Sequence, residues 1–149
     1  MPRAPCVASK YYCMPGPATR IRLLIIDDSA DFQLLVKTFL QDTNFFCFSA
    51  GDALQATGIA VREKPRVILL DIGLPGGDGV LLLERLRANT HTKTLPIIVA
   101  TSQIAPGLEA KVRAKGAVAF LKKPIDKQIL LETLQRVLQE SAHATTTHH

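Results

Sequence analysis

Residues 67–79 read VILLDIGLPGGDG and carry the clearest structural signal in this sequence. Its first four residues are apolar without a polar interruption, which is typical of a strand buried on both faces, as in a parallel sheet. The apolar run ends at Asp71, and a loop rich in glycine and proline follows. The stretch therefore predicts a short buried strand that delivers a carboxylate to its carboxyl end.

Similar apolar runs precede and follow this one. The five runs begin near Leu23, Phe45, Val67, Ile97 and Val118, at spacings of 22, 22, 30 and 21 residues. Each interval accommodates a strand, a helix and two short loops, and the longest interval indicates an enlarged loop after the third strand. The alternation predicts an α/β fold, a doubly wound five-stranded parallel sheet with helices on both faces.

The segments between the runs carry helix signals. Apolar residues recur at helical spacing before the second run and after the fifth. These residues are Phe32, Leu35, Val36, Phe39 and Leu40 in the first segment, and Leu130, Leu134, Val137 and Leu138 in the last. The candidate N-caps are Asp52, Asp78 and Asp126.

Charge and cysteine content limit the functional classes. The net charge is +5, but residues 1–20 supply three basic residues and no acid, leaving 15 basic and 13 acidic residues elsewhere. Without a basic stripe interleaved with aromatic residues, we expect no direct binding to nucleic acid. The three cysteines, with no secretory signal, favour reduced thiols in the cytoplasm. No apolar run is long enough to span a membrane.

Composition also predicts the domain organisation. Residues 1–20 contain four of the nine prolines, which predicts a flexible N-terminal extension. Residues 21–140 form one domain, and residues 141–149 form a flexible tail whose last two histidines resemble a tag remnant.

Polar residues gather where the predicted strands end. In a doubly wound sheet the carboxyl ends of the strands form the functional edge. This edge receives Asp27, Asp28, Asp71, Thr101, Lys122 and Lys123. Singly, each has an ordinary interpretation as a helix cap, a turn residue or a strand end. Together, three carboxylates repel one another unless a cation compensates their charge, and Mg²⁺ suits such a set of oxygen ligands. A carboxylate-bound Mg²⁺ with a lysine and a hydroxyl beside it is an arrangement suited to phosphoryl transfer.

Four segments carry a family resemblance. They are LLIIDD (23–28), VILLDIGLPGGDG (67–79), PIIVATS (96–102) and AVAFLKKP (117–124). In this order and spacing the chain resembles the receiver domain of two-component response regulators, of the chemotaxis-regulator type. The resemblance implies the flavodoxin-like strand order 2-1-3-4-5. It also implies a phosphorylatable signalling switch rather than an enzyme, a sensor histidine kinase or histidine phosphotransfer protein as donor, an effector of unknown identity, and a monomer or weak dimer.

The resemblance assigns roles around the phosphoacceptor. Asp71 would accept the phosphoryl group, Asp28 would ligate Mg²⁺ directly, and Asp27 would act mainly through bound water. The backbone carbonyl of Gly73 would complete the protein ligands. Gly73 is also a departure, because the family often has a polar side chain there.

The resemblance also assigns the switch. Thr101 would close onto the phosphoryl group, and Phe120 would reorient with it, although tyrosine is also common at that position. The family places its ammonium directly before the proline, which selects Lys123. Side chains alternate along a strand, so Lys122 shares a face with Phe120 and Lys123 lies on the other. A cis Lys123–Pro124 bond would aim the ammonium.

Two other functions use a related architecture. A Mg²⁺-dependent phosphatase with an aspartyl-phosphate intermediate usually needs Asp-x-Asp after its first strand, whereas this chain has Asp71-Ile-Gly and Asp28-Ser-Ala. A flavodoxin-like cofactor binder needs a hydroxyl-rich phosphate loop after the first strand, where this chain has two acids. The Walker A pattern is absent from the glycine-rich loop.

Overall fold

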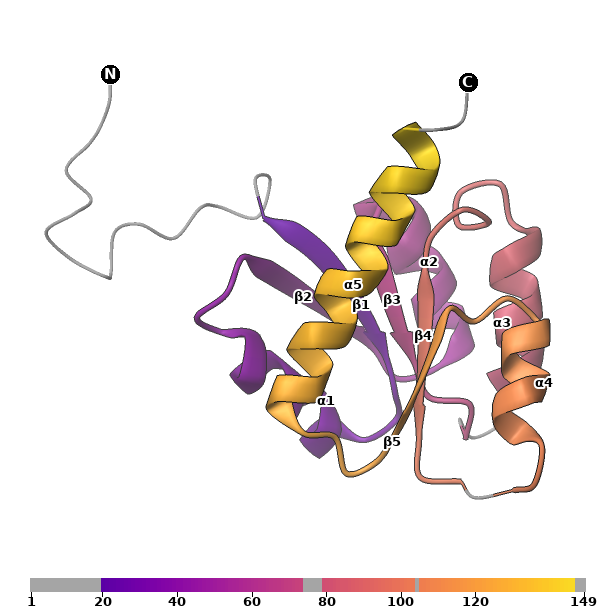
Figure 1. The fold of residues 1–149 in the computed structure, drawn as a ribbon, viewed down its shortest axis with the longest axis horizontal. Helices are drawn as coiled ribbons and strands as arrows, with labels where there is room; N and C mark the ends of the chain where they lie inside the picture. The colour runs from indigo at the N-terminus through magenta and orange to yellow at the C-terminus, as the bar shows by residue number, and fades with distance from the viewer. Residues whose placement is uncertain (1–19, 74–78, 104, 147–149) are drawn as a thin grey trace, which may run out of the picture.

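The computed structural model describes residues 20–73, 79–103 and 105–146. Its centre is a five-stranded parallel sheet in the order β2-β1-β3-β4-β5, which confirms the predicted architecture and strand order (Figure 1). The strands are β1 (Ile21–Ile26), β2 (Phe45–Ala50), β3 (Val67–Leu70), β4 (Ile97–Thr101) and β5 (Ala119–Lys122).

A helix follows every strand. The helices are α1 (Ala30–Leu40), α2 (Ala53–Glu63), α3 (Gly79–Ala88), α4 (Leu108–Ala114) and α5 (Lys127–Thr146). The connection from β3 to α3 covers residues 71–78 and is the longest of those that leave a strand, as the spacing predicts. None of the helices in the described part of the chain has the length and apolarity that crossing a membrane requires.

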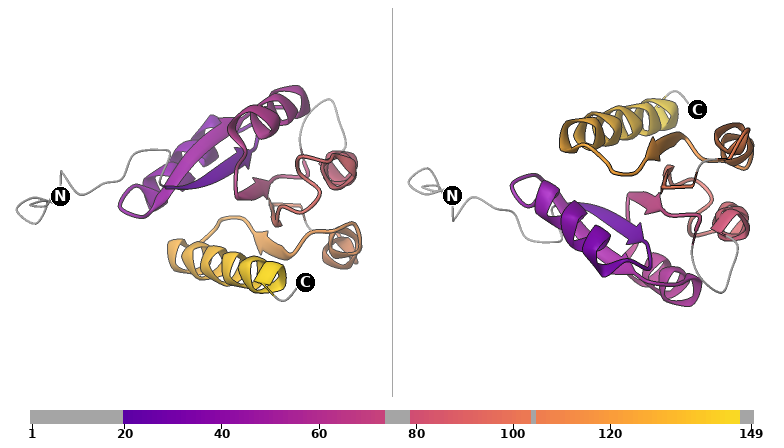
Figure 2. Two further views of the ribbon diagram at one scale, coloured as in Figure 1. Left: turned by 90° about the horizontal axis from the view of Figure 1, so that it is seen from above. Right: turned by 90° about the horizontal axis from the view of Figure 1, so that it is seen from below.

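The sheet separates two hydrophobic cores. Leu24 and Ile26 of β1 pack with α2, α3 and α4 on one face, whereas Leu23 and Ile25 pack with α1 and α5 on the other. The end-on views show these helices on opposite sides of the sheet (Figure 2). Because successive side chains point to opposite faces, an uninterrupted apolar strand supplies both cores at once.

The N-terminus of α1 frees the two acids after β1 from a capping role. Ser29 is the N-cap, and its hydroxyl accepts a hydrogen bond from the backbone N–H of Phe32 at 3.2 Å. The ordinary interpretation of Asp27 or Asp28 as the helix cap is therefore wrong, and both carboxylates remain available at the sheet edge.

Two of the three predicted caps are confirmed. Asp52 accepts a hydrogen bond from the N–H of Gln55 at 2.8 Å, and Asp126 accepts one from the N–H of Ile129 at 3.1 Å. The third, Asp78, lies outside the described residues.

Two details differ from the sequence expectations. Helix α5 continues through Thr146 rather than ending at residue 140, and the sequence there, Ser-Ala-His-Ala-Thr-Thr, contains no helix breaker. Leu35 is 38% exposed although it fits the apolar period of α1. It lies roughly 140° around the helix axis from the buried Leu40, at the far margin of the apolar stripe.

Of the predicted N-terminal extension, residues 1–20, only Arg20 is among the described residues.

Candidate functional site: an acidic cluster at the carboxyl edge of the sheet

Three carboxylates converge where the two central strands end. Asp27 and Asp28 follow β1, and Asp71 follows the neighbouring strand β3. One oxygen from each carboxylate lies within 4.8 Å of the others. Asp27 is buried, Asp71 is partly buried and Asp28 is exposed, so the cluster is open to solvent on one side. The sequence prediction that these three acids meet is confirmed.

A lysine from the far strand neutralises part of this charge. The Nζ of Lys123 lies 2.5 Å from Asp27 Oδ2 and 3.2 Å from Asp71 Oδ2. The backbone N–H of Lys123 donates to the carbonyl of Thr101 at 3.0 Å, which continues the pairing of β4 with β5 past the last strand residue. Strand alternation therefore turns Lys123 to the acids, while Lys122 is exposed and lines a pocket beside α4. The peptide bond before Pro124 is cis, as expected.

Burial and hydrogen bonding oppose each other at Asp27. Removal from water raises the pKa of this carboxyl, while the Lys123 hydrogen bond and the backbone N–H of Ser29 act in the opposite direction. The Ser29 N–H donates to Asp27 Oδ1 at 2.9 Å. A carboxylate held in this way, beside two others, gains from an additional cation. The donor set consists of carboxylate oxygens in a partly open cluster, and this fits Mg²⁺.

The loop after β3 orients Asp71. The backbone N–H of Gly73 donates to Asp71 Oδ1 at 2.9 Å, leaving Oδ2 facing Lys123. The Gln103 side chain lies beside Gly73, because a Cβ on the glycine would sit 3.1 Å from Gln103 Nε2. Gln103 is not among the site residues that the sequence predicts. Its position two residues after Thr101, at the same sheet edge, was the available signal.

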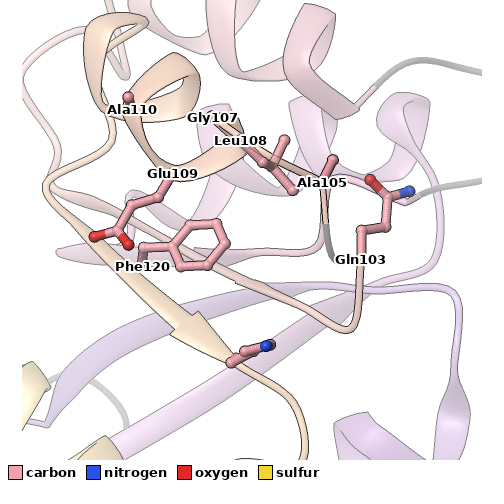
Figure 3. A pocket seen from close by; sticks show the side chains of 8 residues that line it. Gln103, Ala105, Gly107, Leu108, Glu109, Ala110 and Phe120 are labelled. Carbon is pink, nitrogen blue, oxygen red and sulfur yellow. The ribbon is translucent and has the colours of Figure 1, made fainter.

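The two predicted switch residues lie on adjacent strands. Thr101 is 1% exposed and ends β4, and its Oγ1 accepts a hydrogen bond from the N–H of Gln103 at 3.1 Å. Phe120 lies on β5, partly buried against the core beneath α4. Figure 3 shows its ring between β5 and α4, at a pocket of about 240 Å³. The lining residues are Gln103, Ala105, Gly107, Leu108, Glu109, Ala110, Phe120 and Lys122.

An aromatic ring forms a further wall of the site. The Nζ of Lys123 lies 4.0 Å from the centroid of Phe32, in the first turn of α1. From the sequence, Phe32 was predicted only as an apolar residue of the helix. Its nearness to Asp28 in the chain was a signal, but helical periodicity accounted for it completely.

A doubly wound sheet carries these acids and the lysine at its carboxyl edge, which is where α/β proteins of this architecture bind their ligands. Comparison with known proteins gives the family, since the response regulator receiver domain matches residues 23–135. The chain belongs to the response regulator receiver domain family.

Individual relatives agree with this assignment. The chain is 30% identical to Protein PilH of Pseudomonas aeruginosa over 117 residues, covering 78% of this chain and 97% of that protein. It is 31% identical to the Phosphate regulon transcriptional regulatory protein PhoB of the same species over 119 residues, covering 80% of this chain but 52% of PhoB. A solved structure of the Vibrio cholerae chemotaxis protein CheY4 is similar, with a TM-score of 0.74 and 30% identity over 79% of this chain and 98% of CheY4.

Family membership establishes the coarse function. Receiver domains are phosphorylatable signalling modules of two-component systems, not classical enzymes, and they interact with histidine kinases or phosphotransfer proteins and with effectors. They generally bind Mg²⁺ at an acidic pocket, and the cluster of Asp27, Asp28 and Asp71 provides one here. These comparisons do not support the phosphatase alternative.

Proposed function

We propose that Asp71 is the phosphoacceptor of this receiver and that it is phosphorylated by a phosphohistidine partner in a Mg²⁺-dependent reaction. One observation carries the proposal: Asp27, Asp71 and Lys123, from three different strand ends, meet within hydrogen-bonding distance. Asp71 is the member of the cluster that is partly accessible, contacts the ammonium and follows the central strand β3.

The transfer is a displacement at phosphorus. A carboxylate oxygen of Asp71 attacks, the new O–P bond forms, the P–N bond of the phosphohistidine breaks, and the imidazole leaves with its electron pair and takes up a proton. Gly73 holds Asp71 Oδ1 through its backbone N–H, so the orientation of the carboxylate is fixed before reaction. The ammonium of Lys123 lies where it stabilises negative charge on the incoming phosphoryl oxygens.

The carboxylates of Asp27, Asp28 and Asp71 and the carbonyl of Gly73 would hold Mg²⁺. Bound there, the ion would neutralise charge on the phosphoryl oxygens. In this assignment Asp28, the exposed acid, is a direct ligand, and Asp27 acts mainly through water. The burial of Asp27 and its short ion pair with Lys123 support the second assignment, whereas Asp28 is exposed.

The phosphorylated state would be transmitted through β4 and β5. A phosphoryl group adds roughly −1.5 to −2 charges and several acceptor oxygens at Asp71. Thr101 and Lys123 hydrogen-bond to these oxygens and draw the two strand ends inward. Phe120 then turns within the space beneath α4, where the pocket gives its ring room to move. The surface formed by α4, β5 and α5 changes shape, and an effector protein reads that change.

Phosphopeptide mapping tests the acceptor. The chain is incubated with acetyl phosphate and Mg²⁺, and mass spectrometry should find one acid-stable, base-labile phosphoryl group on the peptide containing Asp71. Asp71→Asn should abolish it, and Asp42→Asn, which alters an exposed acid outside the cluster, should not. Retention of the phosphoryl group in Asp71→Asn would contradict the assignment.

A further inference from the structure

We propose that Phe32 is a positioning residue for Lys123 and that its ring holds the ammonium at the phosphoacceptor through a cation–π contact. This inference rests on the proposed function, because it concerns the lysine that serves the phosphoryl site. The observation behind it is that the Nζ lies 4.0 Å from the ring centroid, well within the range of about 6 Å over which a ring face attracts a cation.

The position of Phe32 is linked to that of Asp27 through the cap of α1. The backbone N–H of Phe32 donates to the hydroxyl of Ser29, and the N–H of Ser29 donates to Asp27. The cap of α1 thus connects the ring to the acid through consecutive hydrogen bonds. The ring also packs against the core that α1 and α5 share. The cap therefore fixes the backbone of Phe32 relative to Asp27, and packing against the core directs the ring.

The enclosure of Lys123 makes the ring contact effective. The lysine side chain is 16% exposed and the side chain of Asp27 is 1% exposed, so the ammonium has few water molecules around it. Cation–π attraction strengthens as the cation loses water. Asp27, Asp71 and the Phe32 ring take the place of water molecules that would otherwise surround the ammonium.

The ring contributes something that the carboxylates cannot. A divalent cation on the acidic cluster or a phosphoryl group on Asp71 alters the charges to which the ammonium is paired. The attraction of the ring depends on its quadrupole and not on the charge of the acids. Phe32 therefore attracts the ammonium of Lys123 whatever the charge on the acids. The ring itself donates no hydrogen bond to the oxygens of Asp71.

The contact is tested first in the unphosphorylated protein by NMR. In the native protein the ring current should shift the protons of the Lys123 side chain upfield. Phe32→Leu keeps an apolar side chain without a ring face and should return these protons to ordinary lysine positions. Phe32→Tyr should preserve the upfield shift. An unshifted lysine in the native protein, or a shift that survives in Phe32→Leu, would overturn the contact.

Its consequence is tested by the rate of phosphorylation with acetyl phosphate. Phe32→Leu should slow the reaction about two- to tenfold, and Phe32→Tyr should restore it. In a Lys123→Met background Phe32→Leu should have no further effect, because the ring would have no ammonium to hold. Phe39→Leu is the matched control, since Phe39 lies on the same helix and packs on the same core. It should lower stability without altering the rate.

The outcomes separate this inference from the proposed function. Absence of phosphorylation at Asp71 in the native chain would refute the proposed function. The positioning role alone would be refuted by either of two results in a native chain that is phosphorylated normally. In the first, Phe32→Leu reacts as fast as the native chain. In the second, Phe32→Leu slows the reaction equally in the native and the Lys123→Met backgrounds.

Discussion

The ammonium of Lys123 lies 2.5 Å from Asp27 Oδ2, although 96 residues separate the two in sequence. They occupy the ends of β5 and β1, which are separated by β3 and β4 in the sheet. The side chain of the lysine therefore reaches along the carboxyl edge past Asp71, which it also contacts. The long, flexible stem of lysine makes this reach possible, and the ion pairs link strands that share no backbone hydrogen bonds.

The adjacent lysines Lys122 and Lys123 allow a matched pair of substitutions. Lys123→Met should slow phosphorylation of Asp71 by acetyl phosphate about tenfold, the usual consequence of losing one charge-assisted hydrogen bond. It should also suppress the chemical-shift changes of Thr101 and Phe120 on phosphorylation. Lys122→Met should leave the rate unchanged, because Lys122 is exposed on the other side of the strand. Equal losses in the two variants would contradict the assignment of Lys123.

Asp27 should destabilise the metal-free protein at neutral pH. Burial raises the pKa of Asp27 above its usual 3.8, so the unfolded state releases this proton before the folded state does. The free energy of unfolding should therefore fall as the pH rises through the folded pKa. Asp27→Asn should be more stable than the native chain at pH 7 by about 1 kcal/mol, with a smaller difference near pH 4.

Urea denaturation between pH 4 and 7, without and with Mg²⁺, checks this effect. Magnesium should stabilise the native chain more than Asp27→Asn, and Asp42→Asn should respond to magnesium as the native chain does. A less stable Asp27→Asn at pH 7 without Mg²⁺ would show that the Lys123 ion pair outweighs the cost of burial.

Sequence alone predicts the sheet and its acidic edge well, for a physical reason. Residues 67–70 are buried on both faces, and such a strand has no room for a polar residue until it ends, so Asp71 marks the boundary and the edge together. The order of the strands in the sheet does not follow from the apolar pattern. Apolar spacing does not distinguish which strand lies at the centre, and only the family resemblance supplied the order.

The sequence did not predict the surroundings of residues whose contacts depend on the direction of the side chain in three dimensions. Phe32 and Leu35 both fit the apolar period of α1, yet one lies over an ammonium and the other faces solvent. Their difference follows from the rotation of α1 about its axis, which local periodicity leaves undetermined within about one residue. Gln103 is similar, because its contact beside Gly73 joins loops from two strands.

Gly79 should tolerate no side chain. A Cβ there would lie 2.2 Å from the Cα of Ile72, and the N–H of Gly79 donates to the carbonyl of Ile72 at 3.2 Å. Backbone cannot yield as a flexible side chain does, so Gly79→Ala should lower the free energy of unfolding by about 3 kcal/mol. It should also weaken Mg²⁺ binding, because Ile72 adjoins Asp71.

Gly58→Ala is the control for this substitution. Gly58 lies inside α2, and a methyl group on its Cα would meet no neighbouring atom within 4 Å, so alanine should stabilise the protein by about 0.5–1 kcal/mol. Chemical denaturation of both variants gives the comparison. A neutral Gly79→Ala would mean that the start of α3 moves away from Ile72 at little cost.

Cys47 should be a poor nucleophile in the folded protein. Burial raises the pKa of its thiol from 9.0 to about 11, with Lys37 and Arg20 acting weakly in the opposite direction. The rate of alkylation by iodoacetamide, followed by peptide mapping, should rise near pH 11 in the native chain and near pH 9 in urea. The unfolded state deprotonates first, so this thiol also lowers stability as the pH rises from 9 to 11. Coincident pH profiles would contradict the burial effect.

The contact between Gly116 and Arg87 allows backbone strain and steric conflict to be separated. Gly116 has a φ of +114°, which side-chain-bearing residues rarely adopt, and a Cβ there would lie 2.6 Å from Arg87 Nε. The Arg87 guanidinium donates to the carbonyls of Gly116, Lys93 and Leu95, and so connects the loops that precede β4 and β5. Gly116→Ala should therefore combine strain at φ with displacement of this guanidinium.

A double-mutant cycle measures the two parts. Gly116→Ala should cost about 3 kcal/mol in the native background, of which about 1 kcal/mol is strain. A Cβ at Gly116 would also lie 2.9 Å from Cγ and from Cδ of Arg87, so the background must remove these atoms together with the guanidinium. In an Arg87→Ala background Gly116→Ala should therefore cost only the strain. Thermal or urea denaturation of the four proteins gives a coupling energy of about 2 kcal/mol. An additive cycle would show that the cost arises from φ alone, and that the Arg87 side chain moves aside without losing its carbonyl partners.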